Sequence, residues 1–172
     1  YHLFNLTNIH IISFLFNTIY RRNLTMEKTN ELNKFLSYMH MGNTIFRIYL
    51  EHAKKLENKK LINLIVEIQE IFKTHEEAIA NLIKEFDEKP TDDLTFAGMM
   101  GVYKEKLKTF NNSFDICLSA IKATNMGMIS ALRFLDENKE LSKGIKEYII
   151  KVIDDYGIII NKFKEFLLQE YR

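Results

Sequence analysis

The chain has 172 residues, enough for one domain, and its 47% hydrophobic and 27% charged residues are ordinary for a globular protein. The net charge of +1, from 24 basic and 23 acidic residues, gives no electrostatic reason to expect a nucleic acid or an anionic membrane as partner. One proline and six glycines disfavour a fold with many tight turns. The single cysteine, Cys117, excludes an intrachain disulfide and a cysteine-rich zinc site, and it fits a reducing cytoplasm.

Residues 1–25 differ from the rest. The apolar stretch Ile9–Tyr20 is shorter than the ~20 residues that span a bilayer. Arg21 and Arg22 follow this stretch instead of preceding it, so it does not fit a secretory signal. We interpret residues 1–25 as a translated upstream region, because two adjacent arginines can be encoded by a ribosome-binding sequence placed shortly before Met26. The alternative is a short membrane anchor or amphipathic extension. Residues 26–172 are then a single helical domain.

Apolar residues recur at helical spacing from Thr29, a candidate N-cap. The core stripe expected for the first helix is Leu32, Leu36, Met39, Phe46, Leu50 and Ala53. A second helix is expected after a break at Asn58. Its stripe, in steps of four and three as in a left-handed bundle, is Leu61, Ile65, Ile68, Phe72, His75, Ile79, Leu82 and Phe86. Glu76 and Glu77 are assigned to its solvated face.

The stretch Asp87–Asp93, which contains Pro90, predicts a linker, and a shorter helix is expected over Leu94–Phe110. Gly98 and Gly101 would allow this short helix to approach a neighbour closely. Ser113 is the candidate N-cap of the next helix. The core stripe expected there is Phe114, Leu118, Ile121, Asn125, Met128, Leu132 and Leu135.

Ser142 is expected to cap the last helix. Its expected stripe is Leu141, Ile145, Tyr148, Val152, Asp155, Ile159 and Phe166. Short connections between long helices favour antiparallel neighbours. The sequence therefore predicts an all-α, antiparallel four-helix bundle with an additional short helix in the central connection. Weak similarity between the two halves, at offsets that align His40 with Asn125 and His75 with Asp155, suggests two related hairpins.

Polar residues interrupt the expected core near the middle of each long helix. His75, Asn125 and Asp155 occupy stripe positions, and His40 lies beside one. Burying such groups costs a few kcal/mol unless they are hydrogen-bonded. His40, His75 and Asp155 offer two nitrogens and a carboxylate, a ligand set that a single Zn²⁺ or Fe²⁺ accepts, with Asn125 as a polar neighbour. The alternative, which we favour, is a hydrogen-bonded layer that fixes helix register without metal.

Two hairpins joined by a proline-containing linker and a glycine-containing short helix resemble ferritin-like bundles. The similarity covers Leu32 to Phe166 and is greatest to the bacterial family called domain of unknown function 2383. The resemblance implies a Glu from two helices and Glu-x-x-His from the other two in di-iron members. Here Phe72-x-x-His75 and Val152-x-x-Asp155 replace the latter, and His40 and Asn125 replace the former. Di-iron oxidase chemistry is therefore not expected.

No phosphate-binding glycine loop, nucleophile elbow or His-Glu-x-x-His motif is present in the sequence. The 13 phenylalanines and 8 tyrosines are aromatic side chains suited to contacts with a partner or with a second copy of the chain. We expect a non-enzymatic module that self-associates or binds a protein partner, without a cofactor. The alternative is a single-metal-binding ferritin-like protein. Met99, Met100, Met126 and Met128 are expected to fill the core.

Overall fold

The computed structural model describes the backbone of residues 3–172 and the side chains of residues 28–95, 98–169 and 171–172. Within these residues every regular element is helical, which confirms the all-α class. The elements are α1 (Leu3–Lys55), α2 (Lys59–Lys84), α3 (Phe96–Lys106), α4 (Ser113–Glu137), α5 (Lys143–Leu168) and the 3-10 turn η1 (Gln169–Tyr171).

Side-chain caps fix where the helices after α1 begin. The Asn58 side chain accepts a hydrogen bond from the backbone N–H of Leu61 at the start of α2, and Ser142 caps α5 as predicted. The predicted cap of α4 is wrong by one residue, because Asn112 and not Ser113 accepts the bond. The predicted cap at Thr29 is also wrong: Thr29 is buried inside α1, with no proline or glycine before it to end a helix.

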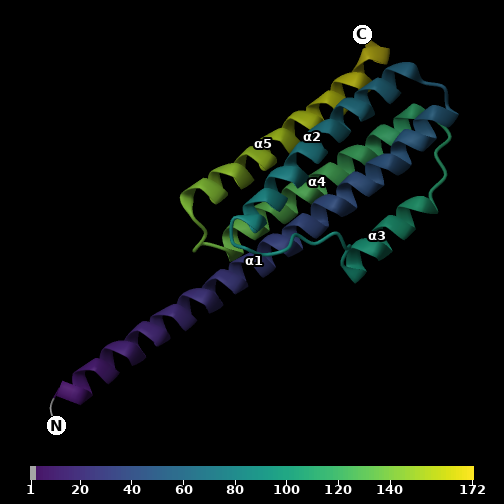
Figure 1. The fold of residues 1–172 in the computed structure, drawn as a ribbon. Helices are drawn as coiled ribbons and strands as arrows, with labels where there is room; N and C mark the ends of the chain where they lie inside the picture. The colour runs from purple at the N-terminus through teal and green to yellow at the C-terminus, as the bar shows by residue number, and fades with distance from the viewer. Residues whose placement is uncertain (1–2) are drawn as a thin grey trace.

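The four long helices lie side by side, with α3 outside them (Figure 1). In this arrangement α1 packs against α2 and α4, and α5 packs against α4 and α2. The α1–α2 and α4–α5 connections are short, so both pairs are antiparallel. The Asn58 amide donates a hydrogen bond of 2.8 Å to the Ser113 hydroxyl. This bond joins the first turns of α2 and α4, so these two helices start at the same end.

The connection that carries α3 therefore has to return along the length of the bundle, and it does so beside α1. The backbone N–H of Thr91 donates to the Asn33 side chain at 2.7 Å, and that of Thr95 donates to the Ser37 hydroxyl at 2.9 Å. Gly101 faces α1, where a Cβ would lie 3.3 Å from the sulfur of Met41. The predicted close approach is thus present, and the side chains of α1 provide hydrogen bonds for backbone that would otherwise lack partners.

The core stripe predicted for α2 is confirmed from Leu61 to Ile79, and that of α1 is confirmed except at half-buried Leu50. The stripe predicted for α4 is wrong. Asn125, Phe114 and Leu132 are exposed. The buried face consists instead of Ile116, Cys117, Ala120, Thr124, Ala131 and Phe134. Because α4 has apolar residues on two faces, periodicity alone selected the face whose residues have the larger side chains.

The last helix and the methionines also differ from the prediction. The stripe predicted for the last helix is confirmed at Leu141, Ile145, Val152 and Ile159. Tyr148, Asp155 and Phe166 are only partly buried, whereas Tyr156 is buried beside Asp155. Met99, Met100 and Met126 are 50%, 43% and 66% exposed, so they are not core residues. These errors share a cause, since a broad apolar pattern does not specify which part of it faces the neighbouring helix.

In the part of the chain that the structure describes, no helix combines the length and the apolarity that crossing a membrane requires. The side chains of residues 1–25 lie outside the described residues. The interpretation of this segment as a translated upstream region therefore stays a prediction.

Candidate functional site

A partly buried cluster joins α1 to α2 around His40. The Nδ1 atom of His40 lies 2.9 Å from Oε1 of Glu76, and its Nε2 atom lies 3.0 Å from the backbone oxygen of Thr91. The amide of Asn43 donates to the other carboxylate oxygen of Glu76, also at 2.9 Å. The two oxygens of Glu76 therefore each accept a bond from α1, and His40 also binds the connection that carries α3.

This geometry defines the charge of His40. A carbonyl and a carboxylate only accept hydrogen bonds, so both ring nitrogens have to donate and the ring carries a proton on each. The hydrogen bond to Glu76, and secondly the bond to the Thr91 carbonyl, raise the pKa of His40 against the opposing effect of burial. His40 and Glu76 consequently form an ion pair, with side chains 25% and 14% exposed.

A second cluster joins α2 to α5 around His75, which is 1% exposed. Its Nδ1 atom lies 2.9 Å from the Tyr148 hydroxyl. Its Nε2 atom lies 3.0 Å from Oδ2 of Asp155, but the angles of this contact do not form a hydrogen bond. Asp155 is also held by Lys151 at 2.5 Å, one turn earlier on α5.

Burial dominates the titration of His75. Desolvation lowers the pKa of His75, and the positive charge of Lys151 adds to this, while Asp155 opposes it. His75 is therefore neutral near pH 7. In that state Nδ1 accepts a hydrogen bond from the Tyr148 hydroxyl and Nε2 carries the ring hydrogen.

The structure brings together two of the three predicted metal ligands. His75 and Asp155 are in contact, whereas His40 is engaged by Glu76 and Thr91. Asn125, the predicted polar neighbour, is exposed on the outer side of α4, so its assignment to the core is wrong. The buried polar residue at that level of α4 is Thr124, whose hydroxyl donates to the backbone oxygen of Ala120.

Two residues of this region were missed. Glu76 was assigned to the solvated face, but it is the acceptor that links α1 to α2. Tyr156 is buried, and burial raises its pKa, with the negative charge of Glu76 adding to the effect. The position of Glu76 four residues after Phe72, on the edge of the apolar stripe, was the available signal. Only the fold shows that α1 presents His40 and Asn43 to that edge.

The donor set does not fit a di-iron centre. Such a centre needs bridging carboxylates. Glu76 and Asp155 belong to separate clusters, and each is already paired with a cationic side chain. Among the described side chains, no group of three or more His, Cys, Asp or Glu is placed to hold a metal ion.

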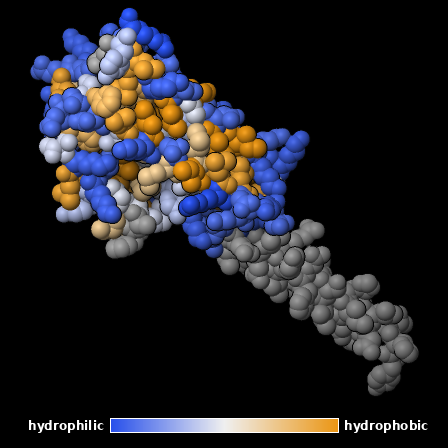
Figure 2. Space-filling model, turned by 180° about the vertical axis from the view of Figure 1, so that it is seen from behind, coloured by the Kyte–Doolittle hydropathy of each residue, from blue (hydrophilic) through white to orange (hydrophobic). Residues whose placement is uncertain are grey.

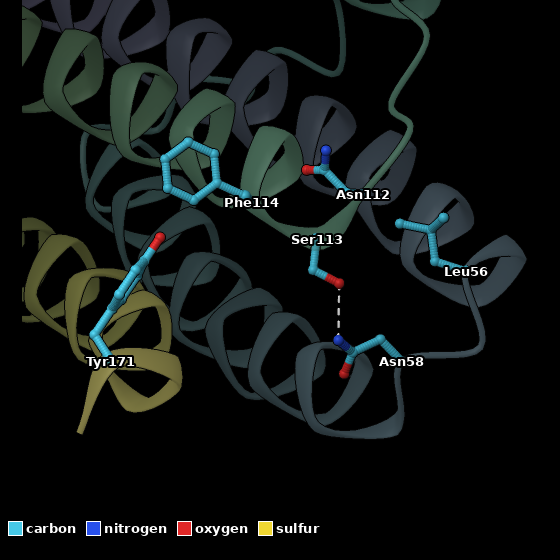
Figure 3. A pocket seen from close by; sticks show the side chains of 6 residues that line it. All are labelled: Leu56, Asn58, Asn112, Ser113, Phe114 and Tyr171. Carbon is cyan, nitrogen blue, oxygen red and sulfur yellow. Dashed lines mark hydrogen bonds between the residues drawn. The ribbon is translucent and has the colours of Figure 1, made fainter.

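A hollow of about 500 Å³ lies at the end of the bundle where α2 and α4 begin. Figure 3 shows Phe114 and Tyr171 on one side of it and the hydrogen-bonded pair Asn58 and Ser113 on the other. Among the described side chains, its lining holds amides, one serine hydroxyl and a phenol, and no carboxylate, imidazole or thiol. This composition supplies contacts for a side chain or small molecule but no general acid–base pair near neutral pH.

Apolar side chains remain on the outside of the bundle. Figure 2 shows hydrophobic residues gathered on the face opposite to that seen in Figure 1. On α4 the exposed ones include Met126, Ile129 and Leu132, and on α5 they include Ile150 and Ile158, each at least 41% exposed. Gathered apolar side chains of this size are a feature of contact surfaces.

A comparison of the chain with protein-family models and with curated protein sequences found no match.

Proposed function

We propose that the chain is an antiparallel four-helix bundle of the ferritin-like kind, similar to the bacterial domain of unknown function 2383. The support is the cycle of neighbours α1–α2–α5–α4 and the single long connection between α2 and α4. Ferritin-like folds have one such crossover, whereas simple up-down bundles have none. The Asn58–Ser113 bond supports the parallel direction of α2 and α4 that a crossover requires.

The proposed activity is non-enzymatic: the bundle binds a protein partner or another copy of itself, with degenerate metal ligands and no cofactor. One observation carries this proposal, the row of exposed apolar side chains on the outside of α4, among them Ile129 and Leu132. Gathered apolar side chains of this kind are a feature of contact surfaces, and burying the part of each that is still exposed gains about half of the 1.5–3 kcal/mol of full burial. A cytoplasmic location and the absence of nucleic acid as a partner remain part of the proposal.

Light scattering of the purified full chain coupled to gel filtration tests the proposal, together with binding of a dye that reports apolar surface. We expect a mass above that of one 20.4 kDa chain, or a monomer that binds the dye strongly. A strict monomer without dye binding would contradict the proposal.

The second candidate is a protein that binds a single divalent metal, Zn²⁺ or Fe²⁺. The observation that favours it is the Nε2 atom of His75, which is buried without a hydrogen bond and lies 3.0 Å from an oxygen of Asp155. Two ligand atoms of one ion have about this separation when each bond is about 2.0–2.1 Å long. His40 would have to leave Glu76 to become the third ligand.

Elemental analysis after metal-free purification and reloading separates the two candidates. The non-enzymatic proposal predicts no stoichiometric metal. One equivalent of metal in the native chain that is lost in His75→Ala and in Asp155→Ala, but kept in Glu77→Ala, would favour the metal-binding alternative. Glu77 is an exposed neighbour of the site and is the matched control.

A further inference from the structure

Between residues 118 and 132 the outward face of α4 is symmetric about Asn125, whereas the next positions of the same face, Phe114 and Asp136, differ in kind. The residues that form it share one stripe of the helix, and at about 100° per residue they all lie within about 40° of Asn125. They are Leu118, Ile121, Asn125, Ile129 and Leu132. Read from either end, the series has the order Leu, Ile, Asn, Ile, Leu with the same spacing. We call these five residues the α4 stripe.

The stripe is accessible in the chain. Asn125 is exposed, Ile129 and Leu132 are 41% and 50% exposed, and Leu118 and Ile121 are half-buried. The opposite face of α4 is already used, because Ala131 and Phe134 belong to the buried core and Phe134 stacks on Phe35 of α1 at 4.7 Å between ring centroids. The stripe is thus an additional apolar face, not a misplaced core.

Three charged residues flank the stripe on one side: Lys122 lies about 60° from Asn125, and Asp115 and Arg133 lie farther round the helix. Asp115 and Arg133 lie at the same angle, about 80° from Asn125 on the helical projection. They are placed almost equally far from Asn125 in opposite directions along the sequence. Within the described side chains neither of them has an ion-pair partner.

A twofold axis through Asn125, perpendicular to α4, makes these features complementary. It brings a second α4 alongside in the antiparallel direction, with Leu118 facing Leu132 and Ile121 facing Ile129 of the other copy. The axis leaves the flank that carries Asp115 and Arg133 on the same side of the dimer in both copies of α4. Asp115 of each copy then lies beside Arg133 of the other, which gives two equivalent ion pairs. Contacts of this isologous kind define a closed dimer.

We propose that the chain forms a homodimer through the α4 stripe, with the twofold axis at Asn125. This inference rests on the proposed non-enzymatic, self-associating function and identifies its partner and surface. Asn125 has a specific role there, since one polar residue in an apolar helix–helix seam selects a single register and orientation at some cost in stability. A heterologous partner would have no reason to match the inverted repeat of the stripe.

Cross-linking tests the position of the axis. In Asn125→Cys the two new thiols lie next to each other across the axis, and mild oxidation of the full chain should convert most of it into a disulfide-linked dimer. Glu77→Cys, exposed on α2, is the matched control and should stay a monomer on a non-reducing gel. The native Cys117 is 0% exposed and gives no background.

Charge exchange tests the orientation. Asp115→Arg or Arg133→Asp alone replaces two attractions by two repulsions, and each should raise the dimer Kd about tenfold at low salt. The double variant restores both ion pairs in reversed sense and should return the Kd to within about threefold of wild type. A parallel pairing would show neither the loss nor the rescue, because Asp115 of one copy and Arg133 of the other would then lie about 27 Å apart along the helices.

A substitution in the stripe tests the apolar contact. Ile129→Lys should raise the dimer Kd at least about a hundredfold, since it places a charge in the seam. Ile158→Lys, at a similarly exposed apolar position on α5, should leave the Kd unchanged. Far-ultraviolet circular dichroism confirms that both variants keep their helices.

The outcomes separate this inference from the proposed function. A dimer that withstands Ile129→Lys and does not cross-link through Asn125→Cys would overturn the α4 surface and leave self-association intact. A wild-type chain that is monomeric at all concentrations would overturn the dimer itself, while dye binding would still support a protein partner.

Discussion

The two histidine–carboxylate pairs of this bundle look alike in composition and differ in charge. His40 is partly exposed and has an acceptor at each ring nitrogen, so hydrogen bonds outweigh burial and its pKa is raised. His75 is almost fully buried, its contact with Asp155 lacks hydrogen-bond geometry, and desolvation lowers its pKa. A carboxylate beside a histidine therefore does not by itself make an ion pair. The charge of the ring also depends on whether the second ring nitrogen has an acceptor and on how exposed the ring is to water.

The two carboxylates contribute differently to the contacts between helices. Glu76 accepts bonds from two residues of α1 and neutralises a protonated ring. Asp155 is held mainly by Lys151 of its own helix and lies near a neutral ring. The first pair therefore holds two helices together, and the second contributes less to the contact between α2 and α5.

The largest expected effect follows removal of Glu76. In Glu76→Ala the protonated ring of His40 and the Asn43 amide lose their acceptor, and we expect the free energy of unfolding to fall by about 3 kcal/mol. Urea denaturation at pH 7 measures it. The exposed neighbour variant Glu77→Ala should change stability by less than about 0.5 kcal/mol. Equal losses in both variants would show that the His40 cluster has no special role.

The next largest effect is on the pH dependence of stability, which should have opposite signs in His40→Gln and His75→Gln. In His40→Gln the described histidine with a shifted pKa is His75, and folding lowers its pKa. Its contribution is present above the unfolded pKa of about 6.5 and is lost as pH falls through the folded value. In His75→Gln the described histidine with a shifted pKa is His40, whose raised pKa gives a contribution that is present below about pH 6.5 and is lost as pH rises through the folded value.

Urea denaturation of both variants between about pH 5.5 and 8, where the carboxylates stay ionised, should give slopes of opposite sign. Neither slope can exceed about 1.4 kcal/mol per pH unit for one group. Slopes of the same sign would refute the assignment of the two charge states.

A smaller effect is expected from Tyr148→Phe. The substitution removes the hydroxyl that binds Nδ1 of His75 and leaves that nitrogen without a partner, at a cost of about 1 kcal/mol. Thermal or urea unfolding measures the loss. Tyr103→Phe, on an exposed tyrosine of α3, is the control and should be neutral. A neutral Tyr148→Phe would mean that water or another residue replaces the hydroxyl.

The smallest effect is expected from Asp155→Asn, which keeps the volume of the side chain and removes its charge. Because His75 is neutral and Lys151 is 59% exposed, we expect a loss below about 0.5 kcal/mol at pH 7. A loss near that of Glu76→Ala would indicate that His75 is protonated in the folded chain and that the two pairs are equivalent.

The sequence by itself determined the helical class and most helix boundaries of the chain after Met26, because caps, breaks and periodicity are local properties of a few residues. Asn58, Ser142 and the stripe Leu61–Ile79 of α2 could be predicted for this reason. The predictions of oligomer, partner and location have not been tested by the fold.

Only the tertiary structure decided which face of a helix is buried and which polar groups meet. The 4-3 spacing fits two faces of α4 equally well, and the contact with α1 selected the face with smaller residues at Ala120 and Ala131, leaving Asn125 outside. Glu76 became part of the polar layer because α1, far away in sequence, presents His40 and Asn43 to it. Such pairings depend on how the helices pack against one another, and no pattern within a single helix contains that information.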